Sequence, residues 1–353
     1  MRCEREERIF YDLKERNKSM KWGRFCLVFS LFLSAFSFAE ESPSAHAGDQ
    51  QGYEVVRGWP QLPEGLSLGQ VPGVDVDSHG NVFIFQRGSY LNALTPRARP
   101  LEAVKEPAVL VMDGESGKVI RRWGEGRFIY PHGVTIDAKD NVWLTDVGLH
   151  QVFKFSRDGK LLMSLGEAGK AGDDEKHFNG PTDVAVLPNG TFFVSDGYGN
   201  NRVMKFSAAG EVLAVWGKKG DKPGEFNLPH SIDVDELGNV YVSDRGNKRI
   251  QVFDLEGKLL GVWKDACGVP YVVKVKGGKR FVADGGDLPG PVNRSSICVF
   301  DKKGNMQNRF GRLGRYEGEF DVAHDVAVDA KTGAVYVVDI LGQRVQKFLP
   351  KNL

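Results

Sequence analysis

The stretch GNVYVSDRGNKRIQVFD, residues 238–254, decides the fold. Apolar and polar residues alternate in it with a period of two, and Val, Tyr, Ile and Phe dominate the two apolar runs. Between the runs lies a short segment rich in Gly and Asn. This alternation predicts two half-buried β-strands joined by a tight turn.

The same pattern recurs along the chain. Further copies contain GNVFIF (80–85), DNVWLTD (140–146), NGTFFVSD (189–196), RFVAD (280–284) and AVYVVD (334–339). The Asp that closes the run recurs at Asp146, Asp196, Asp244, Asp284 and Asp339, in steps of 50, 48, 40 and 55 residues. Such periods, made of short strands, are typical of propeller blades. We therefore predict an all-β fold, a six-bladed β-propeller, and interpret the repeated Asp as a blade-stabilising turn residue.

The last copy lacks a fourth strand. It offers only RVQKF (344–348) after its closing Asp, whereas YEVVRGW (53–59) precedes the first copy. We expect residues 53–59 to complete the last blade, because joining both ends of the chain in one sheet removes exposed sheet edges.

Composition favours one domain without a nucleic-acid partner. Of the 353 residues 41% are hydrophobic, and the formal net charge is +1. This balance gives no basic surface for nucleic acid. We expect residues 48–353 to form a single, monomeric propeller, since all-β domains often exceed the usual domain size.

The N-terminal region predicts export. An apolar run at 25–38 follows Lys21 and Arg24, and it has the length of a signal-peptide core rather than of a spanning helix. We assign residues 1–47 to a charged preface plus a signal peptide, with Met20 as a candidate true start. The expected location is periplasmic or extracellular, without stable membrane insertion after cleavage. An uncleaved membrane anchor is the alternative.

Two cysteines, Cys267 and Cys298, remain after the predicted cleavage. In an oxidising compartment they could pair. Two buried free thiols are the equal alternative.

Three of the seven histidines occupy the same place in alternate copies: His132 in YPHGV, His230 in LPHSI and His324 in VAHDV. Equivalent positions of alternate blades converge on the axis of a closed ring. Three His ligands with an open fourth position form a catalytic zinc site. The other histidines in the copies, His79, His150 and His177, lack this position and are interpreted as solvated or structural.

A family resemblance rests on motifs spread over nearly the whole chain after residue 53. They are GQVPGVDVD (69–77), FQRG (85–88), YPHGVTID (130–137), TDVGLHQVFKF (145–155), HFNGPTDVAV (177–186), VSDGYGNNR (194–202), LPHSIDV (228–234), DRGNKRIQVF (244–253) and AHDVAVD (323–329). Together they resemble the catalytic core of peptidyl-α-hydroxyglycine α-amidating lyases, which are NHL-type propellers.

The resemblance implies a zinc, a structural calcium and a reaction. Such lyases cleave a peptide ending in α-hydroxyglycine into an amidated peptide and glyoxylate. Carried over by motif, the catalytic residues are Tyr198, Arg87 and Arg245. The zinc ligands are His132, His230 and His324, and the calcium ligands are the carbonyls of Val74 and Val134 and the carboxylate of Asp325.

The residue types suit that chemistry. Zinc lowers the pKa of a coordinated hydroxyl, and two guanidinium groups favour the tyrosinate that a phenol needs to act as a base. Arg also binds a substrate carboxylate bidentately. Calcium takes only oxygen ligands.

The chain departs from animal members of the family at two places. Asn179 and Gly199 replace two cysteines whose disulfide flanks the tyrosine loop, and Val322-Ala323 replaces Met-Pro before the last His. Both cysteines are absent together, which is consistent with the loss of one bond.

The alternative function is a non-catalytic exported NHL propeller that binds a peptide or glycan and keeps metal for stability. The joint presence of Tyr198, Arg87 and Arg245 favours the enzyme. A calcium-dependent lactonase-like propeller would need Asn, Asp and Glu around the axis, and the His set argues against it.

Overall fold

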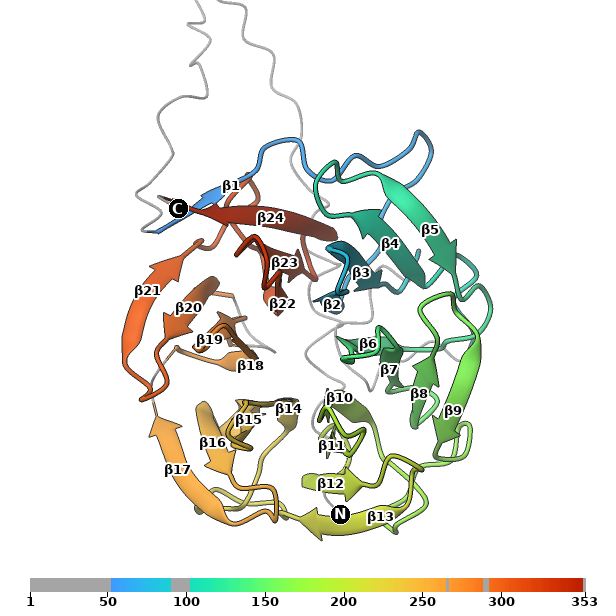
Figure 1. Cartoon of the computed structure of the whole chain (residues 1–353), viewed down its shortest axis with the longest axis vertical. Helices are drawn as coiled ribbons and strands as arrows, with labels where there is room; N and C mark the ends of the chain where they lie inside the picture. The colour runs from blue at the N-terminus through green and yellow to red at the C-terminus, as the bar shows by residue number, and fades with distance from the viewer. Residues whose placement is uncertain (1–51, 90–101, 265–266, 288–291, 352–353) are drawn as a thin grey trace, which may run out of the picture. The chain divides into compact units, whose positions relative to one another are not determined.

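The computed structural model describes residues 52–89, 102–264, 267–287 and 292–351. The predicted preface and signal peptide, with Met20, lie outside these residues. Within them, 24 strands form six four-stranded antiparallel sheets around a central axis (Figure 1). The six-bladed propeller is therefore confirmed. No helix in the described part of the chain is long and apolar enough to cross a bilayer.

The strands of each blade run from the axis outward. Blade 1 has β2 (Gly73–Val76), β3 (Asn81–Phe85), β4 (Val109–Asp113) and β5 (Val119–Trp123). Blade 2 has β6 (Pro131–Ile136), β7 (Val142–Asp146), β8 (Gln151–Phe155) and β9 (Leu161–Leu165). Blade 3 has β10 (Pro181–Val186), β11 (Phe192–Asp196), β12 (Arg202–Phe206) and β13 (Val212–Trp216).

The second half of the ring repeats this order. Blade 4 has β14 (Pro229–Val234), β15 (Val240–Asp244), β16 (Arg249–Phe253) and β17 (Leu259–Lys264). Blade 5 has β18 (Pro270–Lys276), β19 (Lys279–Asp284), β20 (Ser296–Phe300) and β21 (Met306–Phe310). Blade 6 has β22 (Ala323–Val328), β23 (Val335–Asp339), β24 (Arg344–Pro350) and, outermost, β1 (Tyr53–Val55).

Ring closure follows the expectation from the sequence. Strand β1 pairs antiparallel with β24, so that Tyr53 lies opposite Pro350 and Val55 opposite Phe348. The Tyr53 ring also stacks on Phe310 of blade 5, with centroids 4.5 Å apart. The two ends of the propeller are thus held in one sheet, and the last blade gains its fourth strand.

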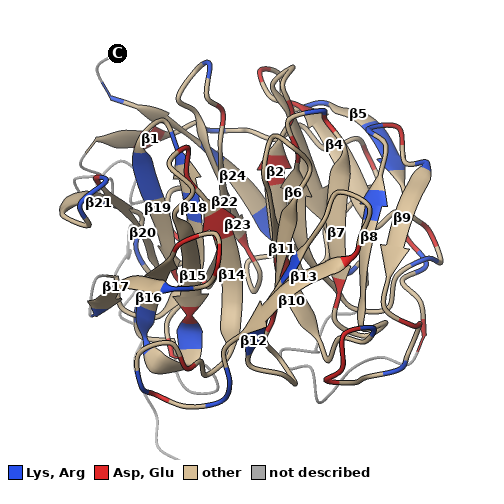
Figure 2. Cartoon of the chain, turned by 60° about the horizontal axis from the view of Figure 1, so that its bottom comes forward, with Lys and Arg blue, Asp and Glu red and all other residues tan. Residues whose placement is uncertain are grey.

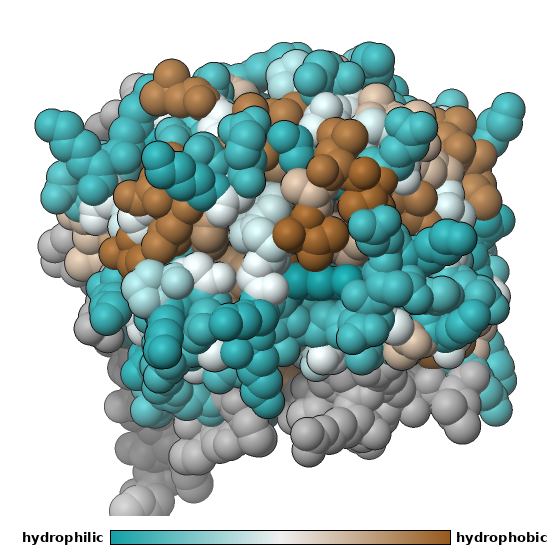
Figure 3. Space-filling model, turned by 90° about the horizontal axis from the view of Figure 1, so that it is seen from below, coloured by the Kyte–Doolittle hydropathy of each residue, from teal (hydrophilic) through white to brown (hydrophobic). Residues whose placement is uncertain are grey.

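Apolar contacts between neighbouring blades form the core. The second strand of each blade is almost wholly buried, and aromatic pairs such as Trp143 and Phe192, 4.5 Å apart, join one blade to the next. The outermost strands alternate between inward and exposed residues, as in β13, where Leu213 is 54% exposed. Figure 3 shows such apolar side chains scattered among polar ones on one face.

The recurring Asp that closes each second strand is structural, as the repeat indicates. Asp146 is fully buried and accepts hydrogen bonds from the backbone N–H groups of Ile129, Tyr130, Gly148 and Leu149. It therefore links the residues that lead into β6 with the turn that follows β7.

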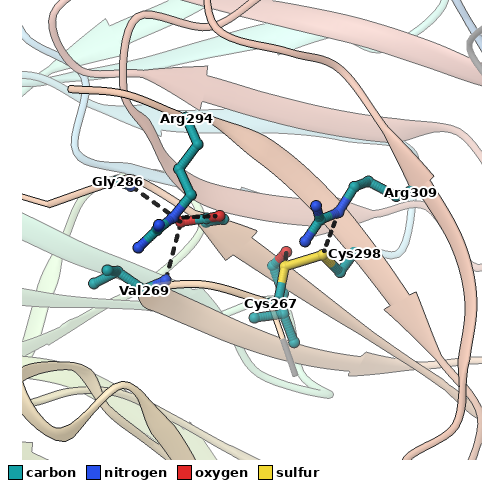
Figure 4. Close-up of a disulfide and its surroundings, with 8 residues drawn as sticks. Cys267, Val269, Gly286, Arg294, Cys298 and Arg309 are labelled. Carbon is teal, nitrogen blue, oxygen red and sulfur yellow. Dashed lines mark hydrogen bonds and ion pairs between the residues drawn. A yellow bond between two sulfur atoms is a disulfide. The ribbon is translucent and has the colours of Figure 1, made fainter. Parts of the chain in front are cut away.

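Cys267 and Cys298 form a disulfide with a sulfur–sulfur distance of 2.06 Å (Figure 4). Both residues are buried in blade 5, and Arg309 Nε lies 3.3 Å from Cys298 Sγ. Of the two alternatives left by the sequence, the paired form is the one present.

A β-bulge in the innermost strands creates the axial site. Five of these strands shift register by one residue just after their first residue. A bulge leaves a residue without a partner on the next strand and re-aims its side chain. The residues just after the first are His132, Thr182, His230, Tyr271 and His324.

Candidate metal centre

The three histidines predicted from the repeat converge on the axis. Nε2 of His132 lies 3.2 Å from Nε2 of His230, and their rings lie 5.1 and 5.0 Å from the ring of His324, centroid to centroid. One nitrogen of each falls within 4.8 Å of the others. Among the described residues, this is the only group of three or more His, Cys, Asp or Glu side chains so placed.

Backbone carbonyls of the neighbouring blades fix the three rings. Each histidine presents Nδ1 to a carbonyl oxygen at 2.7 Å, and each acceptor belongs to the next blade around the ring. The acceptors for His132, His230 and His324 are Thr182, Tyr271 and Pro72, respectively. A hydrogen bond at Nδ1 orients the ring and leaves Nε2 free to bind a metal.

Burial keeps the imidazoles neutral. It lowers the pKa of His132 to about 3, and the nearby Arg87 guanidinium acts in the same direction. Burial also holds the pKa values of His230 and His324 well below the usual value, with His132 as the next cause in both cases. Neutral imidazole is the form that binds a metal.

The nitrogen geometry fits zinc. Zn–N bonds of about 2.0–2.1 Å at tetrahedral angles place two ligand nitrogens about 3.3 Å apart. The observed 3.2 Å between Nε2 of His132 and of His230 agrees. The donor set, three neutral imidazoles and no carboxylate, is also one that zinc accepts with a fourth position left open.

Tyr198 covers this triad from one side. It follows β11, is half-buried, and its Oη lies 3.1 Å from Nε2 of both His132 and His230. Two backbone hydrogen bonds hold its loop, from Tyr198 N to Gly180 O at 3.1 Å and from Gly199 N to Asn179 O at 2.6 Å. The hydroxyl therefore faces the nitrogens that a metal would use.

Arg87 approaches from blade 1. Its side chain is 3% exposed, and it donates from Nε to Pro131 O at 3.0 Å and from Nη1 to Gln70 Oε1 at 2.9 Å. Its guanidinium stacks on Tyr130, 3.8 Å from the ring centroid. Burial lowers the pKa of Arg87, against the opposing influence of Tyr130 and Tyr198.

Arg245 approaches from blade 4 in the same manner. It opens the short 3₁₀ helix η2 (Arg245–Asn247) and stacks on Tyr271, 3.7 Å from the ring centroid. It also donates from Nη2 to Tyr271 Oη. Two Arg–Tyr stacks therefore flank the triad.

Tyr271 is the site residue that the sequence interpretation missed. Its ring lies 5.3 Å from His230 and 5.5 Å from His324, and it occupies in blade 5 the bulge place that a histidine holds in blade 4. Burial raises the pKa of Tyr271 to about 12, which Arg245 opposes, so the phenol is neutral near pH 7. The sequence does contain a signal for it: Pro270-Tyr271 occupies in the fifth copy the position that Pro229-His230 occupies in the fourth.

The residues expected to bind calcium lie just beneath the triad. Asp325 Oδ2 accepts the N–H of Val74 at 3.0 Å, and its Oδ1 accepts the N–H of Val326 at 2.8 Å. Val134 lies on β6, whose backbone comes so close to β2 that a Cβ on Gly73 would meet His132 O at 2.7 Å. These contacts bring Val74 and Asp325 together through a backbone N–H.

Comparison with known proteins gives one family and one fold. The NHL repeat matches residues 128–155, 178–206 and 226–253. The chain is 34% identical to human NHL repeat-containing protein 3, with 85% of each chain covered. It is 32% identical to peptidyl-alpha-hydroxyglycine alpha-amidating lyase 1 of Drosophila melanogaster, covering 85% of this chain and 60% of that protein.

Other similar proteins are longer or more distant. Peptidyl-glycine alpha-amidating monooxygenase A of Xenopus laevis is 36% identical over 83% of this chain, which spans only 33% of that relative. A solved gluconolactonase from Xanthomonas campestris shares the fold alone, with a TM-score of 0.58 and 14% identity over 81% of this chain and 87% of that one.

Proposed function

This chain belongs to the NHL-repeat β-propeller family that includes the peptidyl-α-hydroxyglycine α-amidating lyases, and we propose that it shares their reaction. It would cleave a peptide ending in α-hydroxyglycine into an amidated peptide and glyoxylate. The observation that carries the proposal is Tyr198 Oη, placed 3.1 Å from Nε2 of both His132 and His230. The phenol that would transfer the proton thus lies beside the three histidines that would hold a metal with one position open.

His132, His230 and His324 would hold the zinc. When bound, zinc supplies Lewis-acid chemistry and lowers the pKa of a hydroxyl that reaches it. The protein's part is to keep the three imidazoles neutral and aimed at one point. The carbonyls of Thr182, Tyr271 and Pro72 orient the three rings, and burial keeps the imidazoles neutral.

Tyr198 would move the proton of the substrate hydroxyl. The O–H bond of the carbinolamide breaks and a C=O bond forms, while the C–N bond breaks and the leaving amide nitrogen gains a proton. Arg87 and Arg245 would hold the carboxylate that becomes part of glyoxylate, because a guanidinium binds a carboxylate bidentately. Stacking on Tyr130 and Tyr271 orients both guanidinium groups.

We place no calcium in this mechanism. The donor set beneath the triad fits a divalent ion poorly, because both oxygens of Asp325 already accept backbone N–H groups and the Lys274 ammonium, 3.9 Å from Asp183, already supplies a positive charge to the nearby carboxylates. The proposed zinc site does not depend on it.

Export belongs to the proposal as well. Residues 1–47 would be a charged preface with a cleaved signal peptide, and the Cys267–Cys298 disulfide fits an oxidising compartment. Sequencing of the N-terminus of the exported protein tests this part.

Release of glyoxylate from a peptide ending in α-hydroxyglycine is the deciding experiment. We expect the purified wild-type protein to release it in step with the amidated peptide and to contain one zinc per chain. The second candidate is a non-catalytic propeller that binds a peptide or glycan, and the resemblance to human NHL repeat-containing protein 3 favours it, because that name carries no activity. Zinc-loaded wild-type protein that releases no glyoxylate would leave the binding function.

A further inference from the structure

A second group of charged residues lies on the innermost strands below the triad. These residues come from the innermost strands of five of the six blades, and on the four of those strands that carry a bulge they follow it. They are Asp75 on β2, Asp183 on β10, Asp233 on β14, Lys274 on β18 and Asp325 on β22, and we call them the acid level. Acidic segments on β2 and β22 are visible in Figure 2.

Each aspartate of the acid level joins two blades. One oxygen accepts the N–H of the following residue, and the other accepts an N–H from the innermost strand of the next blade. The second contacts are Asp75 to Ile136 N at 2.7 Å, Asp183 to Ile232 N at 3.3 Å, Asp233 to Val275 N at 2.7 Å and Asp325 to Val74 N at 3.0 Å. The last of these contacts spans the closure of the ring.

Lys274 is the cation of the acid level. Its residue is 8% exposed, and its Nζ lies 3.9 Å from Asp183 Oδ2, whose residue is 5% exposed. A buried charge is expensive unless an opposite charge compensates it. The carboxylates of Asp183, Asp325, Asp75 and Asp233, in that order of strength, hold the pKa of Lys274 above its usual value despite burial.

The carboxylates of the acid level do not converge on one point. Within the described residues, no three of them bring oxygen atoms within 4.8 Å of one another, whereas the histidine triad does. Calcium takes six to eight oxygen ligands at about 2.3–2.6 Å. The acid level therefore spreads its carboxylates around a long, flexible side chain instead of focusing them on a point.

We propose that the Lys274 ammonium is a built-in axial cation, which stabilises the ring in the place of a bound structural calcium. Two kinds of compensation then act on the four carboxylates: the charge of the Lys274 ammonium, and two backbone N–H groups on each. The propeller needs no divalent ion to close. This inference concerns the stability of the fold and stands whether or not the protein is a lyase.

Metal content and thermal unfolding of the full-length wild-type protein test it first. Protein that has been incubated with a millimolar excess of CaCl₂ and then gel-filtered should contain no stoichiometric calcium, and the same excess should leave the Tm of chelator-treated, zinc-reloaded protein unchanged. One calcium per chain after gel filtration, or a Tm that rises with CaCl₂, would overturn the proposal.

Substitution of Lys274 gives the second test. Lys274→Met keeps most of the stem and removes the charge, so its Tm should fall by about 10 °C, since a buried pair has lost one partner. The Tm of Lys274→Ser should also fall. CaCl₂ should recover part of that loss, because the space left by the ammonium can then take a cation. The control Lys276→Ser changes an exposed lysine of the same strand, and its Tm should equal that of the wild type.

Two results with the Lys274 variants would contradict the proposal. Lys274→Met that unfolds at the wild-type temperature contradicts the proposal, and so does Lys274→Ser that gains nothing from CaCl₂. Should neither variant fold, the calcium content and Tm of the wild type decide alone.

Discussion

Two levels of one axis, built from the same innermost strands, follow different rules. At the metal level, three blades present a histidine from the same bulge position, and each ring is fixed by the next blade's carbonyl. At the acid level, the innermost strands of five blades carry four aspartates at two different positions and one lysine. The metal level keeps the symmetry of the repeat, and the acid level does not.

The difference shows which positions of the repeat need equivalent residues in this fold. A single metal ion needs equivalent ligands on a symmetry axis, so the repeat is retained where an ion would bind. Closing a ring of six blades only requires that each charge find a partner nearby, so unequal residues serve. We therefore expect changes at the metal level to remove chemistry, and changes at the acid level to remove stability.

The largest effect should follow from the double substitution His132→Ala and His230→Ala. Two of three ligands are lost, so zinc content should fall from one per chain to background and turnover should become undetectable. Metal analysis and the glyoxylate assay measure both. Far-ultraviolet circular dichroism should stay that of the wild type, and His79→Ala, an exposed residue outside the triad, should keep both zinc and turnover. Retained zinc in the double variant would show that the ion binds elsewhere.

Tyr198→Phe should produce the next largest effect. The ring packing against His132 and His230 persists while the hydroxyl is removed, so turnover should fall about 10²–10⁴-fold. Zinc content and Tm should change little. Tyr316→Phe, at a residue that is 76% exposed, is the matched control. Equal turnover in both variants would leave the lyase function standing but remove Tyr198 from the proton transfer.

Arg87→Lys should reduce turnover about 10–100-fold, which is the value of one or two charge-assisted hydrogen bonds. Lysine cannot reproduce the fork that reaches Pro131 O and Gln70 Oε1 while stacking on Tyr130. Steady-state kinetics should place most of the loss in kcat/KM. The control Arg157→Lys alters a half-exposed arginine paired with Asp77, away from the triad. An unchanged kcat/KM in Arg87→Lys would contradict the carboxylate-binding role.

The metal level could be predicted from the sequence because its signal is a repeat. The motifs around His132, His230 and His324 align by eye, and the alternating strands and the missing fourth strand of the last blade predict the ring and its closure. The bulge itself could not be predicted, because alternation of apolar and polar residues does not reveal a one-residue shift in register. Convergence on the axis was an inference from symmetry alone.

The acid level could not be predicted because its residues do not repeat. Lys274 lies in the fifth copy, where nothing in the sequence marks it as axial rather than exposed. Asp325 was assigned to calcium by resemblance alone, and nothing in the sequence indicates that its two oxygens accept the N–H groups of Val74 and Val326. The pairing of Cys267 with Cys298 was also open, because spacing in sequence does not give the distance between two thiols.

Asp75→Asn should leave the metal level intact and weaken the ring. The amide keeps one accepting oxygen but cannot accept both N–H groups, from Val76 and Ile136. A donor left without its acceptor costs about 1–3 kcal/mol of the free energy of unfolding. Chemical denaturation measures this cost, while zinc content and turnover should equal those of the wild type. Loss of zinc in Asp75→Asn would contradict the division between the two levels.

The smallest effect on turnover should come from the double variant Asn179→Cys and Gly199→Cys, which would introduce the disulfide that the family resemblance implies for animal members beside the tyrosine loop. The two residues already touch, because Gly199 N donates to Asn179 O and a Cβ on Gly199 would lie 2.1 Å from Asn179 Cγ. Since backbone hydrogen bonds already hold Tyr198 at its place, closing the bond should raise Tm, through the entropy of the unfolded chain, and change kcat by less than about twofold. Mass spectrometry confirms the bond, and the reduced form of the same variant is the control. A kcat that rises tenfold on oxidation would instead show that the tyrosine loop is too loosely held in this chain, and that the proton-transfer geometry at the metal level is its weakest part.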